Sequence, residues 1–293
     1  MRHGAQTSRA AQKGREASGD FLAGLAAAHL IAGTSTKVPH TPLQFVPWRR
    51  SIAPMWMRIA LCLCLLPKPL VAAEVTIAVA ANFLTTARAL VNMYEAQNDD
   101  QVVLVHGSTG RLAAQIFQGA PFDVFLSADS ARPKDLAGAG RTILVAPYAI
   151  GRLIFVTRAA SGDWPEVLDT NTPIALANPA LAPYGVAAEA ALDAAGHDAA
   201  SLELILGDSV GQVAGFLVTG NVTQGFVAAA QAPLLPEEFR SLPVPVTDDL
   251  LVQSAALLSD EPAARAIFDW LLADEARGLI ASSGYDLPDA AKE

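Results

Sequence analysis

Cysteine is almost absent from this chain. The 293 residues include only two, Cys62 and Cys64, and both lie in one short apolar stretch, Met57–Ala73. This stretch has a basic start, an apolar middle and a small-residue end, which is typical of a secretory signal. We expect cleavage near Ala73, which leaves a mature chain without cysteine. A disulfide, a redox pair and a thiolate metal site are then all excluded.

A membrane-spanning run is also missing from the candidate signal, because its apolar part is too short to cross a bilayer well. We therefore interpret residues 57–73 as a cleaved signal peptide and predict a periplasmic protein. Residues 1–56 are polar, basic and aperiodic, with no pattern long enough to bury a core. We interpret them as an overextended start of translation; the alternative is a disordered N-terminal arm.

Basic side chains become scarce after residue 73. Residues 1–73 contain nine Lys and Arg against two Asp and Glu, whereas the rest contains 11 against 27, a net charge of -16. A chain this acidic lacks the basic face that binds nucleic acid or an anionic membrane. It also cannot attract an anion by its overall charge, so any anion site must depend on local dipoles.

Strand and helix patterns alternate from Glu74 onward, which predicts an α/β fold with mostly parallel sheets. A last helix is expected after Asp260-Glu-Pro262, and no strand partner lies near it in the sequence. We predict that it returns to the first of two lobes, formed by residues 74–154 and 246–293, with residues 155–245 as the second lobe. Short apolar runs indicate strands at Val75–Ala80, Gln101–His106, Asp123–Ser127, Gly151–Thr157, Pro173–Ala177, Leu202–Leu206 and Thr223–Ala228.

Two of these strands lead into a helix through small polar residues, at Ala81-Asn82 and at Gly107-Ser108-Thr109-Gly110. The first turn of a helix has N–H groups without partners and the positive end of the helix dipole. Two such ends that converge would form an anion site without lysine or arginine. The simpler interpretation is that Asn82 and Ser108 only cap their helices. Two junctions after successive strands favour a site, because ligands of open α/β sheets bind beyond the carboxyl ends of strands.

Three segments resemble the periplasmic molybdate-binding proteins of ABC importers. They are Ala80-Ala-Asn-Phe83, the stretch from Gly107 to Asp129 with its Gly119-Ala-Pro-Phe-Asp123, and Asn178-Pro-Ala-Leu-Ala-Pro-Tyr-Gly185. The similarity extends in order over essentially all of residues 74–285. It implies the type II periplasmic binding fold, with two lobes, a mostly parallel sheet flanked by helices in each, and a ligand cleft between them.

The resemblance also implies a set of ligand residues. Ala81 and Asn82 would bind the oxyanion from the first junction, Ser108 from the second, Tyr184 from the Pro-Tyr-Gly turn, and Val210 through its backbone N–H. Many relatives have a tyrosine in a late strand where this chain has Ala228; a subgroup without it has asparagine at the first junction, as here. The implied ligand is molybdate or tungstate, with molybdenum held only inside the oxyanion, no protein–metal bond and no cofactor. The implied partner is a membrane permease, and we expect a monomer.

Two alternatives remain open at this point. The site could serve another oxyanion such as sulfate, since only its size would exclude that dianion. A serine hydrolase using Ser108 and His106 is also conceivable, but two residues so close on one strand and turn do not form a triad, and no carboxylate partner is evident. We therefore expect no enzyme activity. Asp123 and Asp129 are more typical of helix caps or cleft braces than of acid–base groups.

Overall fold

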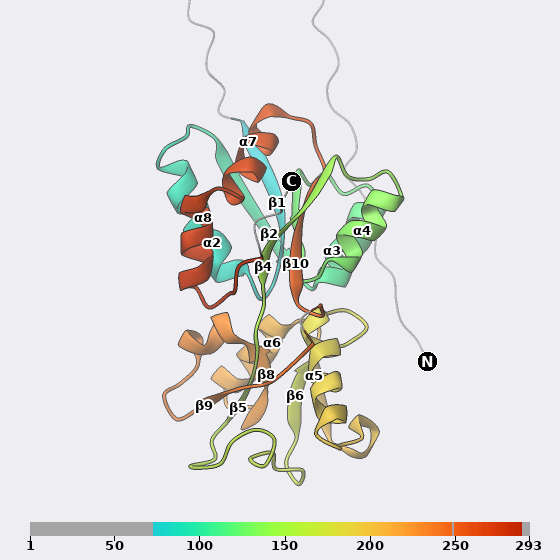
Figure 1. Ribbon diagram of the computed structural model, residues 1–293, viewed down its shortest axis with the longest axis vertical. Helices are drawn as coiled ribbons and strands as arrows, with labels where there is room; N and C mark the ends of the chain where they lie inside the picture. The colour runs from blue at the N-terminus through green and yellow to red at the C-terminus, as the bar shows by residue number, and fades with distance from the viewer. Residues whose placement is uncertain (1–72, 248, 289–293) are drawn as a thin grey trace, which may run out of the picture. The chain divides into compact units, whose positions relative to one another are not determined.

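The computed structural model describes residues 73–247 and 249–288, so the predicted N-terminal extension and nearly all of the predicted signal peptide lie outside the described residues. The described chain forms two five-stranded sheets, each flanked by helices (Figure 1). The first sheet has the order β2-β1-β3-β10-β4 and the second the order β7-β6-β8-β5-β9. This is the two-lobed α/β architecture that the sequence predicts.

The first lobe combines both ends of the described chain. Its strands are β1 (Glu74–Ala80), β2 (Gln101–Gly107), β3 (Val124–Leu126), β4 (Leu144–Ile150) and β10 (Val252–Leu257). Its helices are α2 (Leu84–Glu95), α3 (Thr109–Phe117), α4 (Ala131–Gly138), α7 (Pro262–Leu271) and α8 (Asp274–Ser282). The last helices therefore return to the first sheet, and α7 contacts both β10 and β1.

The second lobe is formed by the middle of the chain. Its strands are β5 (Leu153–Thr157), β6 (Ile174–Ala177), β7 (Leu204–Gly207), β8 (Gln224–Ala228) and β9 (Arg240–Pro243). Its helices are α5 (Pro183–Ala194) and α6 (Val210–Val218), with the short 3-10 helices η1 (Ala199–Ser201) and η2 (Ala229–Leu234). Both α5 and α6 follow strands directly, so their N-termini lie at the carboxyl ends of β6 and β7.

The prediction of mostly parallel sheets is wrong in one respect. In the first sheet β1 pairs in parallel with β2 and β3, but β10 is antiparallel to both β3 and β4. In the second sheet β6 is parallel to β7 and β8, but β5 is antiparallel to β8 and β9. The antiparallel strands β4, β5, β9 and β10 are those on either side of the two crossings between lobes, which do not follow the right-handed strand–helix–strand path of parallel pairs.

Helices cover both faces of the first sheet, which explains its continuous apolar strands. Val75, Ile77 and Val79 of β1 pack with α2, α7 and α8, whereas the intervening Ala78 packs with α3 and α4. Figure 1 shows these two groups of helices on opposite sides of the sheet. Successive residues of a strand point to opposite faces, so both faces of β1 contribute apolar side chains to the core.

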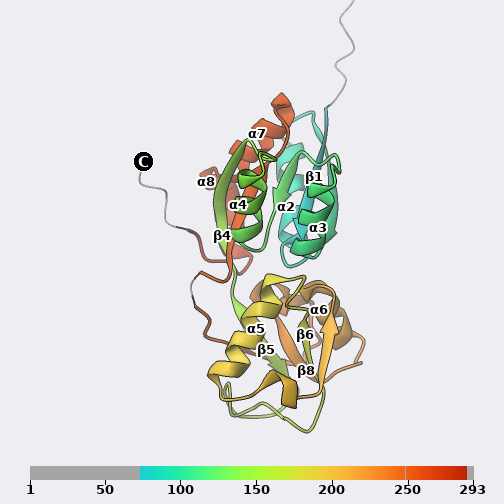
Figure 2. The ribbon, with the colours of Figure 1, turned by 90° about the vertical axis from the view of Figure 1, so that its right-hand side faces the viewer.

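Two crossings connect the lobes, one from β4 to β5 through Gly151 and one from β9 to β10 (Figures 1 and 2). The crossings are hydrogen-bonded to each other: Gly151 N–H donates to the carbonyl of Leu251 at 2.9 Å, and Val244 N–H donates to that of Leu153 at 3.1 Å. Paired extended segments of this kind can bend together, so we expect this region to act as the hinge between the lobes.

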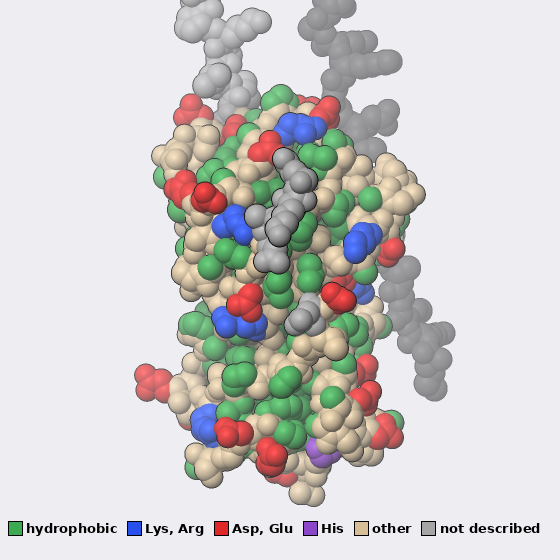
Figure 3. Space-filling model, in the orientation of Figure 1, with side chains coloured by type: hydrophobic (Ala, Val, Ile, Leu, Met, Phe, Trp, Pro, Cys, Tyr) green, Lys and Arg blue, Asp and Glu red, His purple; other side chains and the backbone are tan. Residues whose placement is uncertain are grey.

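Charged side chains are scattered on the surface. On the face in Figure 3, acidic groups are dispersed among polar and apolar ones, and the Lys and Arg side chains are separate from one another. Across the part of the chain that the structure describes, no helix is both long enough and apolar enough to span a bilayer.

Candidate anion-binding site

The first junction is a turn rather than a direct entry into a helix. Residues 81–83 form a turn after β1, and α2 begins at Leu84 with Phe83 as its N-cap. Asn82 therefore does not cap α2. Its side chain is buried, with 3% exposed, and its Nδ2 donates to Oε1 of Gln253 at 3.0 Å and to the Tyr285 hydroxyl oxygen at 3.4 Å.

Ala81, the other residue expected at this junction, offers no free backbone donor. Its N–H donates to the carbonyl of Gly107 at 2.9 Å, and its side chain is a methyl group. That methyl group approaches Gly211 of the second lobe, where an added Cβ would lie 3.2 Å from it. Ala81 thus lines the junction with its methyl group. The next backbone donor along the chain is the N–H of Asn82.

Ser108 is the N-cap of α3, in an extended conformation with φ -69° and ψ 144°. Its hydroxyl group nevertheless makes no capping hydrogen bond, and this buried oxygen has no partner among the described residues. Ser209 at the start of α6 shows the contrast, since its hydroxyl oxygen accepts from the N–H of Gln212 at 3.3 Å. The interpretation of Ser108 as a plain helix cap is therefore wrong.

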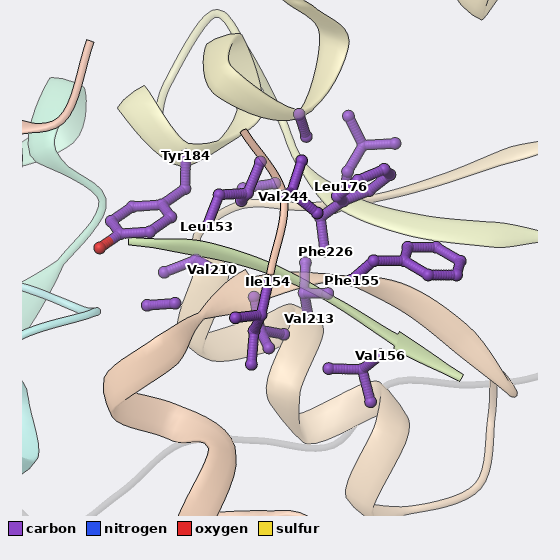
Figure 4. Close-up of a cluster of buried hydrophobic side chains, with 14 of the residues drawn as sticks. Leu153, Ile154, Phe155, Val156, Leu176, Tyr184, Val210, Val213, Phe226 and Val244 are labelled. Atoms are coloured by element: carbon purple, nitrogen blue, oxygen red, sulfur yellow. The ribbon is translucent and has the colours of Figure 1, made fainter. Parts of the chain in front are cut away.

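Tyr184 is the second residue of α5, after the N-cap Ala182 and Pro183 at the first helical position. The side chain is 2% exposed, and its ring leaves the apolar cluster of the second lobe with the hydroxyl oxygen pointing away from the other labelled side chains (Figure 4). Burial, reinforced by the nearby Tyr285, raises the pKa of Tyr184 well above its ordinary value, whereas Asn82 and Gln253 lie near enough to lower it. The hydroxyl group is close to both amides but has hydrogen-bond geometry with neither.

Val210 is the first residue of α6, and its side chain packs in the second lobe's core. None of the hydrogen bonds found between described residues involves its N–H. A residue at this position has no intrahelical acceptor for its N–H, so this donor is available to a ligand. The side chain takes no part in that role.

The two lobes meet at these helix ends. Gly110 N–H of α3 donates at 2.9 Å to the carbonyl of Leu181, just before α5. At the rim, Arg111 of α3 and Asp208 before α6 form an exposed ion pair at 2.8 Å. A hollow of about 350 Å³ lies beside Ser108 and is lined by His106, Gln115 and Gln212 among others. The N-termini of α3, α5 and α6 and the turn before α2 thus lie around one interface.

Four buried side-chain atoms have no hydrogen-bond partner among the described residues: Asn82 Oδ1, Ser108 Oγ, Tyr184 Oη and Gln253 Nε2. Leaving a buried polar atom unpaired costs about 1–3 kcal/mol, so four in one protein require an explanation. Three of them belong to residues that the sequence predicts as ligands. No other buried side-chain atoms of the described residues are unpaired, so the whole set lies at or next to the predicted site.

Gln253, which lies in β10 and is completely buried, was not predicted from the sequence. Its Oε1 also accepts from the Tyr148 hydroxyl group at 2.9 Å. The only signal available was a glutamine inside the apolar run Leu250-Leu-Val-Gln-Ser-Ala-Ala-Leu257, where a buried strand should have no polar side chain. Tyr148 and Tyr285 were missed as well, because nothing in the sequence brings them near Asn82.

The side chains that were expected to have no catalytic role form no catalytic arrangement with Ser108. His106 is exposed, and it makes no hydrogen bond to the unpartnered Ser108 hydroxyl group. Asp129 accepts from the Ser127 hydroxyl group at 2.9 Å and is bound by Arg132. Asp123 accepts from the N–H of Thr76 at 2.8 Å and so braces the sheet. Within residues 73–247 and 249–288, no group of three or more His, Cys, Asp or Glu side chains could hold a metal ion.

Comparisons with known proteins agree with this geometry. The family model described as bacterial extracellular solute-binding protein matches residues 75–286. The chain is 35% identical to the molybdate-binding protein ModA of Azotobacter vinelandii over 229 residues, which are 74% of this chain and 91% of that one. It is 36% identical to ModA of Rhodobacter capsulatus over 74% of this chain and 90% of that one.

A solved structure extends the likeness to three dimensions. The periplasmic molybdate-binding protein of Azotobacter vinelandii matches with a TM-score of 0.67 at 30% identity, covering 74% of this chain and all of that one. All of these relatives are named as molybdate-binding proteins, which agrees with the expectation of a binding role rather than an enzyme activity. The chain therefore belongs to the bacterial extracellular solute-binding proteins and, among them, to the family of the molybdate-binding proteins.

Proposed function

We propose that the mature chain is a periplasmic binding protein that captures molybdate, and tungstate with it, and delivers the oxyanion to the permease of a membrane ABC importer. The proposed ligands are the backbone N–H groups of Asn82 and Val210 and the hydroxyl groups of Ser108 and Tyr184, with Ala81 as a lining residue. The observation that carries the proposal is that both hydroxyl groups are buried and unpartnered at the interface of the lobes.

The donor set suits a fully deprotonated tetrahedral anion. Molybdate and tungstate are dianions at neutral pH, accept hydrogen bonds and donate none. Hydroxyl and N–H donors bind such a ligand favourably, because hydrogen bonds to a charged acceptor are about twice as strong as neutral ones. An anion that must donate a proton would find too few acceptors in this set.

Helix dipoles supply the favourable potential that the net charge of the mature chain opposes. The N-termini of α3, α5 and α6 reach the interface of the lobes, and each carries partial positive charge. The nearby Arg132 is bound to Asp129, and Arg111 is paired with Asp208 in solvent. The anion is therefore held by fixed dipoles rather than by a cationic side chain.

Closure provides the signal to the permease. Ser108 and Asn82 belong to the first lobe and Tyr184 and Val210 to the second, so only a closed molecule offers all the donors at once. A ligand that contacts both lobes favours the closed state by its difference in affinity between states. We expect a monomer to perform this cycle, with the permease recognising the closed form.

A titration calorimetry experiment on residues 74–293 tests the function. We expect molybdate and tungstate to bind with one site each, and sulfate to compete only at far higher concentration because it is smaller. Equal competition by sulfate would assign the site to oxyanions in general. Absence of heat with molybdate and tungstate alike would overturn the proposal.

A further inference from the structure

Gln253 is the one residue of the unpartnered set that sequence analysis did not predict. It is completely buried at the start of β10, next to a register shift between Gln253 and Ser254 in the pairing with β4. The second crossing between the lobes ends here, so Gln253 lies at the hinge. The inference that follows rests on the proposed function, because it concerns how the same site holds its anion.

The orientation of the Asn82 amide is fixed by Tyr285. The Tyr285 hydroxyl group donates to the backbone carbonyl of Asn82 at 2.8 Å, and a carbonyl can only accept. The single hydroxyl proton is therefore used, and the oxygen of Tyr285 can only accept from the Asn82 side chain at 3.4 Å. The atom of Asn82 that faces Tyr285 must be the donor Nδ2.

The orientation of Asn82 in turn fixes Gln253. Because Nδ2 of Asn82 also faces Gln253 at 3.0 Å, the facing atom of Gln253 must be the acceptor Oε1. The Tyr148 hydroxyl group lies 2.9 Å from the same oxygen and 3.2 Å from the Ser127 carbonyl, and it can donate its proton to either acceptor. The other end of this amide, Nε2, then has its two hydrogens on the side away from Asn82 and Tyr148.

Gln253 Nε2 and the Tyr184 hydroxyl group converge at Gly151. A Cβ added at Gly151 would overlap the Tyr184 oxygen and would lie 2.8 Å from Gln253 Nε2. Both atoms are buried and neither has a partner among the described residues. An N–H donor that approaches a hydroxyl oxygen occupies its lone pairs, so the hydroxyl proton must point elsewhere.

We propose that Gln253 is a positioning residue that makes Tyr184 a donor to the bound oxyanion: as the lobes close, Gln253 Nε2 donates to the Tyr184 oxygen and directs its proton into the site. Tyr285 fixes the orientation of the Asn82 amide, Asn82 Nδ2 donates to Gln253 Oε1, and Gln253 Nε2 is thereby left to donate to this hydroxyl group. Gln253 does not touch the anion. Without it, the Tyr184 hydroxyl group is free to turn its lone pairs toward the anion, which is repulsive.

A double-mutant cycle with molybdate affinity as the readout tests this role. Gln253→Met preserves the length of the side chain and removes its hydrogen bonds, and we expect about a tenfold or greater loss of affinity. The Tyr184→Phe variant has no hydroxyl group to direct. In that background the same change should lower the molybdate affinity only about two- to threefold, through the lost hydrogen bond to Asn82. An unchanged affinity in the single variant, or an equal loss in both backgrounds, would overturn the inference.

Gln224→Met is the matched control, because Gln224 is a buried glutamine of β8 whose Nε2 donates to the Asp169 and Thr172 carbonyls. Its loss should lower the melting temperature without changing the affinity. Failure of the wild-type chain to bind molybdate would refute the proposed function, whereas binding that is unaffected by Gln253→Met refutes only this inference.

A measurement on chains that keep Gln253 covers the case in which Gln253→Met does not fold. In protein labelled with ¹⁵N at glutamine side chains, the Gln253 amide signals should shift on addition of molybdate, and they should shift much less in Tyr184→Phe. Signals that do not respond to molybdate, or that respond equally in both proteins, would contradict the role.

Discussion

The Asn82 side chain donates a 3.0 Å hydrogen bond to the side chain of Gln253, which lies 171 positions later in the chain. The turn that follows β1 is thereby joined to β10, the strand that follows the second crossing between the lobes. One residue of this pair lies at the junction expected to bind the anion. The other lies where the chain passes between the lobes, so the proposed anion site and the crossing between the lobes share one hydrogen-bond network.

Ser108→Ala should separate binding from stability. The Ser108 hydroxyl group has no partner within the protein, so its removal takes no hydrogen bond from the fold. We expect molybdate affinity to fall about tenfold or more, because a hydrogen bond to a charged group contributes about 1.5–3 kcal/mol. The melting temperature should stay the same or rise slightly.

Ser209→Ala is the comparison for that variant. The Ser209 hydroxyl oxygen caps α6, so its loss should destabilise the fold by about 1 kcal/mol. Calorimetric affinity and thermal melting of both variants give the answer. A Ser108→Ala protein that binds molybdate as the wild type does would remove Ser108 from the site.

Val210→Pro tests a backbone donor in isolation. Proline is well tolerated at the first position of a helix and lacks an N–H. The preceding Ser209 is extended, with φ -149° and ψ 162°, as a residue before proline should be. We expect Val210→Pro to fold and to bind molybdate about tenfold or more weakly.

Val210→Ala is its matched control, because it keeps the N–H and shortens the side chain. This variant should be less stable, because it buries fewer apolar atoms, and its molybdate affinity should stay within about twofold of the wild type. Equal affinities of the two variants would show that the Val210 N–H makes no contact with the anion.

Gly151→Ala should weaken binding through Tyr184. A methyl group at Gly151 would overlap the Tyr184 hydroxyl oxygen and crowd Gln253. The Tyr184 ring must then move out of the position from which it reaches the interface of the lobes. We expect a clear loss of molybdate affinity, measured by calorimetry, and a larger loss than in Gly138→Ala, where an added Cβ meets nothing within 4 Å. Similar affinities would place Tyr184 outside the site.

The free energy of unfolding at alkaline pH should depend on the buried tyrosines. Burial raises the pKa of Tyr184 and Tyr148 well above the ordinary 10.0. Below pH 10 these groups are protonated in both folded and unfolded chains, and the stability they give is fully present. Above it the unfolded chain releases protons that the folded chain retains, so the free energy of unfolding falls, by about 1.4 kcal/mol per pH unit for each group. Tyr184→Phe should flatten this decline in urea titrations at increasing pH, and an unchanged slope would contradict it.

How far the sequence predicts this site depends on how local each signal is. Asn82 and Ser108 could be found because each follows an apolar strand within a few residues. Tyr184 and Val210 came only from the resemblance, since a tyrosine beside proline and a valine after serine have no local mark of a ligand. The free hydroxyl group of Ser108 was not predictable. A serine at the start of a helix usually makes a capping hydrogen bond, and its absence here depends on the tertiary structure.

The fold shows the same division. Seven strands were predicted near their observed bounds, namely β1, β2, β3, β5, β6, β7 and β8, whereas β4, β9 and β10 were not recognised. Each of these pairs antiparallel with a strand far away in the sequence, and this is also why the sheets are mixed. Gln253 was missed for that reason, since its role depends on β10 lying between β3 and β4.

The most direct test of the central claim is the affinity of Ser108→Ala and Tyr184→Phe for molybdate, compared with the wild-type residues 74–293 by titration calorimetry. The two residues belong to different lobes and share no hydrogen bond, and each hydroxyl group is unpartnered. If a neutral cleft binds the dianion, the wild type binds one molybdate and each variant binds it at least about tenfold more weakly, with the fold intact. Wild-type binding that both variants retain in full would contradict the account.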